Sequence, residues 1–328
     1  MKKIPKPNFR FFLVEKLTLA YILITTIAIL SLAGYSRAYP LMLHRLIILS
    51  VILFLAYLDS ILNWRSIKIL RNVFIGMLIV FWYPETFDIN RFISNHDYLL
   101  ANWDQMLFGF QPAFLFCQFF TWHWFSELMN MGYFFYYLLI VGSIVYIYFN
   151  HREYFEYFFF TILFSFFIYY LVFIIFPTAG PQYYYSAIGI QNIKSGVFPQ
   201  IGNYFNQNPT LIPPHFEHGF FVDLVERVQK FGERPTAAFP SSHVGISTLI
   251  LLLLIRGRHY SIFIITFPLY LILVFATIYI QAHYVVDVIG GIISALILYW
   301  ISPVAFKLFI PNFSSKKEKI LIDENNNR

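Results

Sequence analysis

Eight long apolar segments dominate this chain and limit the folds open to it. A run of about 20 apolar residues is long enough to cross the hydrocarbon core of a bilayer as a helix. Only 12% of the 328 residues are charged and 59% are hydrophobic, whereas a soluble domain carries about 25% charged residues. We therefore predict an all-α integral membrane protein with about eight transmembrane helices, near residues 17–35, 44–62, 69–83, 129–149, 155–177, 240–256, 260–280 and 285–307.

A shorter segment between the third and fourth spans has a different pattern. Within residues 97–110 the apolar side chains recur at helical spacing, and Asp97, Asp104 and Gln105 lie between them. This pattern predicts an amphipathic helix that lies in the membrane interface and does not cross the bilayer.

The basic residues of the loops indicate how the chain crosses the membrane. Five segments fall on the same side as the N-terminus: 1–16, 63–71, 150–153, 256–259 and 307–328. They hold 16 of the 23 Lys and Arg residues, and such an excess is typical of cytoplasmic loops. We therefore expect a multi-pass protein of the inner (cytoplasmic) membrane, with both termini in the cytoplasm and with residues 178–239 and 281–284 on the extracytoplasmic face. The net charge of +6 then needs no nucleic acid partner.

Polar residues open the span at 240–256. Pro240 suits the first turn of a helix, where its missing N–H is no loss. Ser241 and Ser242 add hydroxyl groups, and the unpaired N–H groups of a helix N-terminus form an anion site. His243 lies 13 residues before Arg256, or about 20 Å of helix, which places it just below the outer surface.

A second histidine returns to the same surface. The span 260–280 runs back outward to His283, and Asp287 follows four residues later on the same helix face. A carboxylate there can accept a hydrogen bond from one imidazole nitrogen. The other imidazole nitrogen is then free to act as a nucleophile. Arg234 and Arg227 in the outer loop supply positive charge and planar donors for phosphate oxygens. This set predicts phosphoryl transfer without a metal or other cofactor.

In order and spacing, these residues resemble the three motifs of the type-2 phosphatidic acid phosphatase superfamily: K-x6-R-P, P-S-G-H and S-R-x5-H-x3-D. Here the motifs read Arg227-x6-Arg234-Pro235, Pro240-Ser241-Ser242-His243 and Ala276-Thr277-x5-His283-x3-Asp287. The resemblance implies a lipid phosphatase or phosphotransferase that acts on a lipid phosphate at the bilayer. It also implies a membrane catalytic domain with a six-helix core at 84–310, after N-terminal transmembrane helices at 1–83 and before a cytoplasmic tail at 311–328.

The roles of the family's residues carry over to matching positions. The resemblance implies that His283 attacks phosphorus and forms a phosphohistidine, that Asp287 orients His283, and that His243 protonates the leaving group. The implied phosphate-binding residues are Arg234, Arg227, Ser241 and, through its backbone amide, Ser242.

Three positions depart from the family's motifs. Arg227 replaces a lysine, Ser242 replaces a glycine, and Thr277 replaces the arginine of the third motif, which removes one phosphate-binding charge. Further segments resemble the inositol-phosphorylceramide synthase-like branch, which includes sphingolipid head-group transferases: Phe176–Pro181, Asp104–Gly109 and His283–Asp287.

Other interpretations of the same residues are open. His283 and Asp287 alone could be a structural pair at a helix end, and Arg227 could lie on a solvated helix face. His215, Glu217 and His218 have a spacing that could hold a metal, although a loop pair of histidines is more often solvated. The rival functions are a transporter with a proton relay and an inactive lipid-binding scaffold. Polar residues at one surface and the lack of a repeat favour the enzyme over a transporter.

Overall fold

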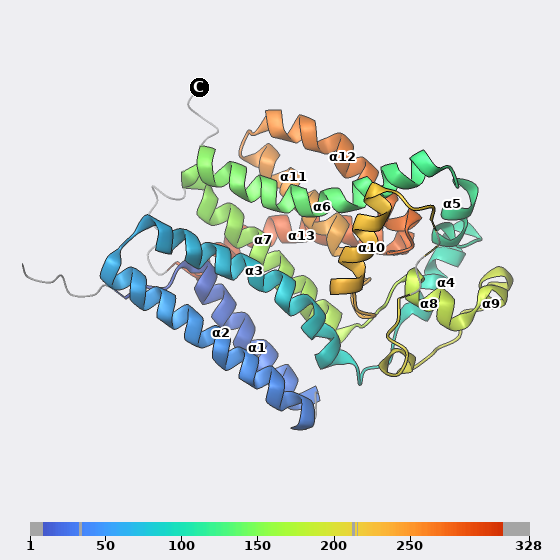
Figure 1. The fold of residues 1–328 in the computed structure, drawn as a ribbon, viewed down its shortest axis with the longest axis horizontal. Coiled ribbons are helices and arrows are strands. Elements are labelled where there is room, and N and C mark those ends of the chain that lie inside the picture. Colours follow the sequence, from blue (N-terminus) through green and yellow to red (C-terminus); the bar gives the residue numbers. More distant parts are fainter. Residues whose placement is uncertain (1–8, 33–34, 212–213, 215, 311–328) are drawn as a thin grey trace, which may run out of the picture.

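The computed structural model describes residues 9–32, 35–211, 214 and 216–310 (Figure 1). Within these residues the chain is almost entirely helical. The helices are α1 (Leu13–Leu32), α2 (Tyr35–Leu62), α3 (Arg65–Asn90), α4 (Asp97–Phe108), α5 (Pro112–Phe119), α6 (His123–Asn150), α7 (Arg152–Ile175), α8 (Pro181–Ile188), α9 (Ile190–Ser195), the short 3-10 helix η1 (Tyr204–Asn206), α10 (Phe220–Gly232), α11 (Ser242–Arg256), α12 (Tyr260–Tyr279) and α13 (Val285–Leu308).

Seven of these helices are long and apolar enough to cross a bilayer: α1, α2, α3, α6, α7, α12 and α13. The remaining predicted span is α11, an apolar helix of 15 residues, which extends over about 22 Å. The all-α membrane architecture predicted from the sequence is therefore confirmed.

The third span is longer than the sequence predicted. We expected residues 69–83, whereas α3 has 26 residues. The apolar run appeared short because Arg71 and Glu85 interrupt it, but both side chains are buried in ion pairs. Pro84 lies inside α3 near its C-terminal end and does not terminate it.

Buried ion pairs attach the first three helices to one another. Arg45 on α2 donates to Glu85 on α3 at 2.7 Å, and Arg71 on α3 donates to Asp59 on α2 at 2.6 Å. Arg71 also pairs with Glu15 on α1. Charges within a membrane are costly unless paired, so these contacts specify how α1, α2 and α3 pack.

The remaining long helices form a second bundle. α6 packs on α7 and α12, α11 packs on α12 and α13, and α3 lies along α7. The large aromatic side chains of α7 fill the centre, with Phe158, Phe160 and Phe173 fully buried. The short helices α4, α5, α8 and α9 gather at one end of this bundle, on the right in Figure 1.

The predicted amphipathic segment at 97–110 forms α4, which ends at Phe108. Its outward face is apolar: Met106 and Leu107 are 79% and 62% exposed. Its two carboxylates point into the protein, where Asp97 and Asp104 are fully buried. An apolar outer face of this kind fits a helix in the membrane interface.

Asp97 and Asp104 join loops that are distant in the sequence. Asp97 accepts hydrogen bonds from the backbone N–H groups of Ala179 and Gly180 at 2.6 and 2.8 Å. Asp104 accepts from the N–H groups of Val285 and Val286 at 2.9 and 3.0 Å. One helix thus fixes both the loop after α7 and the start of α13.

Candidate active site

The site begins at the N-terminus of α11, where Ser241 is the N-cap. Its hydroxyl oxygen accepts a hydrogen bond from the N–H of Val244 at 3.3 Å, and Ser242 is the first helical residue. Pro240 therefore precedes the cap, which corrects our prediction that it lies in the first helical turn. Ser241 and Ser242 are both buried, and His243 follows in the first turn.

Two glycines allow α11 and α13 to approach closely at this level. A Cβ atom on Gly291 of α13 would lie 2.6 Å from the carbonyl oxygen of Ser241, and a Cβ on Gly245 of α11 would lie 3.0 Å from the carbonyl oxygen of Gly291. The N–H of Ser241 also donates to the carbonyl of Asp287 at 3.0 Å. Small residues at a helix crossing let backbones meet, so the first turns of the two helices lie against each other.

His283 lies just before α13, in the turn that follows α12. Its N–H donates to the carbonyl of Thr277 at 3.0 Å, so the position that departs from the third motif holds the backbone of this turn. Tyr284 is the N-cap of α13, and its N–H donates to Asp287 at 2.9 Å. We expected His283 on the first turn of the helix, but it lies two residues before the first helical residue, Val285.

The two histidines meet despite their separation in sequence. Nε2 of His283 lies 3.3 Å from Nδ1 of His243, within hydrogen-bonding distance. On the other side, Nδ1 of His283 lies 3.4 Å from a carboxylate oxygen of Asp287. The structure therefore aligns His243, His283 and Asp287 in one row, with the carboxylate behind His283.

Aromatic rings and burial set the environment of this row. The ring of His243 lies against Tyr133 and Tyr136, with centroids 4.7 and 4.4 Å apart. His283 is 3% exposed, and burial lowers the pKa of its imidazole to about 4. His283 is therefore neutral at neutral pH, the state in which an imidazole nitrogen can act as a nucleophile.

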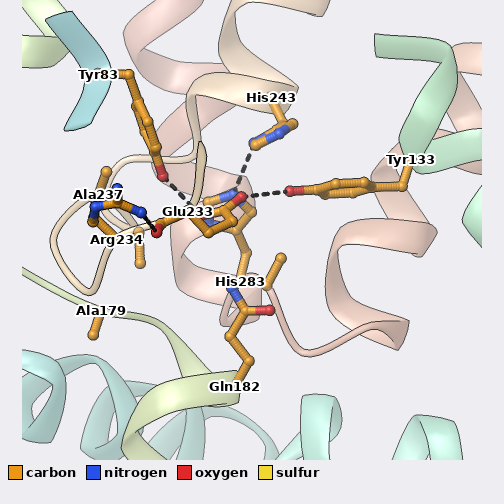
Figure 2. A pocket seen from close by; sticks show the side chains of 11 residues that line it. Tyr83, Tyr133, Ala179, Gln182, Glu233, Arg234, Ala237, His243 and His283 are labelled. Atoms are coloured by element: carbon orange, nitrogen blue, oxygen red, sulfur yellow. Dashed lines mark hydrogen bonds between the residues drawn. The ribbon is translucent and has the colours of Figure 1, made fainter. Parts of the chain in front are cut away.

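A small pocket opens beside the histidines (Figure 2). Its volume is about 10 Å³, roughly room for one water molecule. Its lining consists of Tyr83, Tyr133, Ala179, Gln182, Glu233, Arg234, Ala237, Ala238, His243, Ala282 and His283. A phosphate group is larger than this volume, so the lining side chains would have to move to admit one.

Arg234 and Arg227 have different positions relative to the pocket. Arg234 lines it, and its guanidinium donates to the carbonyl of Glu233 at 2.7 Å. Arg227 is exposed on α10 and does not line the pocket. Gln229, two residues further along that helix, is buried and donates to Gln182 at 3.2 Å.

The histidines of the loop before α10 do not come together as a ligand set among the described residues. His218 is exposed, and its Nδ1 lies 2.9 Å from Asp223. Glu217 instead approaches His123 of α6 at 3.6 Å. His215 lies outside the described residues.

The comparison with protein families decides the identity of this arrangement. The family model described as the PAP2 superfamily matches residues 99–301, more than half of the chain. The chain belongs to the PAP2 superfamily. Searches of curated proteins and of solved structures give no match. The matched region contains both histidines, Asp287 and Arg234, whereas Tyr83 comes from α3, before the match begins.

Several residues of this PAP2 site were not predicted from the sequence. Glu233, Tyr83, Tyr133 and Gln182 all line the pocket. The sequence could have indicated Glu233 as a site residue, because it directly precedes Arg234 and Pro235 of the first motif. No such indication exists for Tyr83 and Tyr133, because each is one tyrosine among 24 in the chain and only the packing of α3 and α6 aims them at the pocket.

Removing the Asp104 carboxylate should weaken the start of α13 in this PAP2 protein. In Asp104→Ala, the N–H groups of Val285 and Val286 lose their acceptor, which costs about 1–3 kcal/mol for a buried group. We expect a lower unfolding temperature in detergent. Met106→Ala is the matched control, because Met106 is on the same helix and 79% exposed. Equal unfolding temperatures for Asp104→Ala and the wild type would contradict this role.

Proposed function

We propose that this protein is a membrane enzyme that cleaves or exchanges a phosphoester of a lipid through a phosphohistidine on His283. Membership of the PAP2 superfamily supports a lipid enzyme of the phosphatase type. The observation that carries the specific proposal is the 3.3 Å contact between Nε2 of His283 and Nδ1 of His243 beside a pocket that Arg234 also lines.

In the first half-reaction, Nε2 of His283 attacks the phosphorus atom of the lipid phosphoester. A P–N bond forms, the P–O bond to the leaving group breaks, and His243, whose protonated form the bound phosphate anion favours, gives its proton to the leaving oxygen. Asp287 lies behind Nδ1 of His283 and stabilises the positive charge that develops on that ring. Arg234 and the N-terminal end of α11 stabilise the negative charge of the phosphoryl oxygens.

In the second half-reaction, an acceptor O–H resolves the phosphohistidine. His243, now neutral, takes the proton of the acceptor while its oxygen attacks phosphorus, and the electron pair of the P–N bond returns to His283. Water as the acceptor gives a phosphatase, and an alcohol gives a phosphotransferase.

A specific observation favours transfer of a phospho-head-group, as in the inositol-phosphorylceramide synthase-like branch. Thr277 occupies the position of the third-motif arginine, is fully buried, and bonds to the carbonyl of Val274 with its hydroxyl. The phosphate-binding residues thus carry one fixed positive charge fewer than the family's motifs supply. A singly charged phosphodiester needs less positive charge than a doubly charged phosphomonoester does. In addition, the outer segment 178–239 can form a cover that excludes water.

We further propose that the site faces the extracytoplasmic side, because Lys and Arg are concentrated in the opposite loops. Ser195 is exposed in the outer segment, and Cys117 is buried. Ser195→Cys should react with a membrane-impermeant thiol reagent in intact cells. Glu153→Cys, exposed in the first turn of α7, should react only after the cells are opened. The reverse pattern would place the site on the cytoplasmic face.

Asp287→Asn should lower the turnover rate by roughly 10²-fold or more while the protein stays folded. The asparagine oxygen can still accept from the N–H of Tyr284, so the start of α13 is retained. The negative charge behind His283 is lost, and with it the stabilisation of the charged ring. Turnover and unfolding temperature should be measured together. A variant with wild-type turnover would show that Asp287 has only a structural role.

The proposed activity can be tested with purified protein and a phospholipid labelled in its head group and phosphate. The reaction is followed with and without diacylglycerol, ceramide or inositol as acceptor. Formation of a labelled product that depends on the acceptor would support transfer, and equal release with and without acceptor would support hydrolysis. No cleavage of any phosphoester in this series would contradict the proposed function.

A further inference from the structure

We propose that Glu233 selects the charge of the phosphate group that enters the pocket, favouring a singly charged phosphodiester over a doubly charged phosphomonoester. This inference rests on the proposed function, because it assigns a substrate class to the same pocket. Glu233 is a specificity-determining residue in this account and takes no part in the bond-breaking steps.

The position of Glu233 is the first observation. It follows the end of α10 and lines the pocket together with Arg234, His243 and His283 (Figure 2). A carboxylate is an unusual part of a phosphate pocket because it repels the anion that the pocket must hold. A phosphate bound in the pocket beside the two histidines would therefore be repelled by this charge at close range.

The charges around the pocket are nearly balanced before a substrate arrives. Arg234 is the one lysine or arginine among the lining residues described above, and Glu233 is their one carboxylate. The two charges offset each other, and Thr277 adds none where the family's third motif has arginine. Each negative charge on an entering phosphate then meets too little net attraction to offset the hydration that it loses, so a second charge makes binding weaker.

Glu233 is held in place by hydrogen bonds from two different helices. The hydroxyl of Tyr83 on α3 donates to one carboxylate oxygen at 2.9 Å, and the hydroxyl of Tyr133 on α6 donates to the other at 3.2 Å. Tyr133 also stacks on His243. Because both oxygens accept hydrogen bonds from side chains of long helices, the carboxylate is fixed beside His243 and His283.

Burial raises the pKa of Glu233, while the two tyrosine donors and Arg234 oppose that rise. A second anion in the pocket favours the protonated form still further. When a dianion binds, either the Glu233 carboxylate repels it or Glu233 takes up a proton. A monoanion is repelled less by the same carboxylate. The titratable and charged groups facing Glu233 are Tyr83, Tyr133, Tyr136, Tyr137, Tyr183, Arg234, His243 and His283.

The test compares two small probes on the full-length protein in detergent at pH 8. Inorganic phosphate is mostly a dianion at this pH, and dimethyl phosphate is a monoanion. The apparent affinity of each probe is read from the rise in unfolding temperature with probe concentration, since a ligand that binds only the folded state stabilises it. This readout needs no catalytic turnover.

Glu233→Gln keeps the shape of the side chain and removes its charge. We expect this variant to bind inorganic phosphate about tenfold more tightly than the wild type does, equivalent to about 1.4 kcal/mol. Its affinity for dimethyl phosphate should change less. Glu226→Gln is the matched control, because it removes the same charge from α10 at a side chain that pairs with Lys230 outside the pocket. It should leave both affinities unchanged.

A folded Glu233→Gln protein with wild-type preference between the probes would overturn the proposal. If this variant does not fold, Tyr83→Phe gives an independent test. Removing one donor should raise the pKa of Glu233, so the loss of phosphate affinity with rising pH should move to higher pH than in the wild type. An unchanged pH dependence would also overturn the proposal.

These outcomes are separable from failure of the proposed function. If Glu233→Gln changes the preference between the probes but His283 never becomes phosphorylated, the pocket selects anions as inferred and the catalytic proposal is wrong. If His283 is phosphorylated and the preference does not change, the catalytic proposal stands and the role of Glu233 is wrong.

Discussion

His283→Ala should reduce turnover of the lipid substrate by roughly 10³-fold or more, and the protein should remain folded. In the proposed mechanism the variant loses the nitrogen that attacks phosphorus, and no other described nucleophile takes its place in the row of His243, His283 and Asp287. The backbone of His283 makes one of the hydrogen bonds of this turn, because its N–H donates to the carbonyl of Thr277. The alanine variant keeps that bond, so loss of activity should not reflect unfolding.

The matched control is His218→Ala, which removes an exposed histidine of the outer loop. It should retain wild-type turnover. Rates and unfolding temperatures of both variants should be measured in the same detergent. If His283→Ala keeps more than a tenth of the wild-type rate, His283 is not the nucleophile.

Gly291→Ala should impair both stability and activity because it separates the two helices that carry the histidines. The new Cβ would lie 2.6 Å from the carbonyl oxygen of Ser241 and 3.3 Å from the N–H nitrogen of Gly245. Both neighbours are backbone atoms, so α11 and α13 must move apart. Overpacking of this kind costs about 1–3 kcal/mol, and a misplacement of about 1 Å at reacting groups can cost roughly 10²-fold in rate.

Gly142→Ala on α6 is the matched control, because a Cβ there would meet no atom within 4 Å. Alanine is the better helix former, by about 1 kcal/mol, so this variant should be at least as stable as the wild type. Unfolding temperature and turnover should be recorded for both variants. If Gly291→Ala behaves as Gly142→Ala does, close approach of α11 and α13 does not set the distance between the histidines.

The spans and the histidine pair were predictable from the sequence for physical reasons. A membrane leaves few alternatives to a helix for a long apolar run, so all eight runs became helices. Because α11 and α12 run in opposite directions, the chain returns to the end of the bundle where α11 begins. His283 therefore lies beside His243, with Nε2 of His283 3.3 Å from Nδ1 of His243.

What the sequence did not reveal depends on packing between distant segments. Asp104 looked like part of the polar stripe of an amphipathic helix, yet it is buried beneath the start of α13. Glu233 directly precedes Arg234, but its place in the pocket depends on Tyr83 and Tyr133, which hold it from two distant helices. Arg227 fits the spacing of a motif, but the exposed face of α10 directs it away from the pocket. Spacing along the chain fixes a position on a helix and does not fix which neighbour that position meets.

The most direct test of the central claim is to trap the covalent intermediate and locate its phosphate. Purified wild-type protein is mixed with a lipid carrying labelled phosphate, quenched within milliseconds under alkaline conditions that preserve phosphohistidine, digested, and mapped by mass spectrometry. We expect the phosphate on the imidazole of His283, and no labelled peptide from His283→Ala. Phosphate on another residue, or rapid turnover with an unmodified His283 at every quench time, would contradict the account.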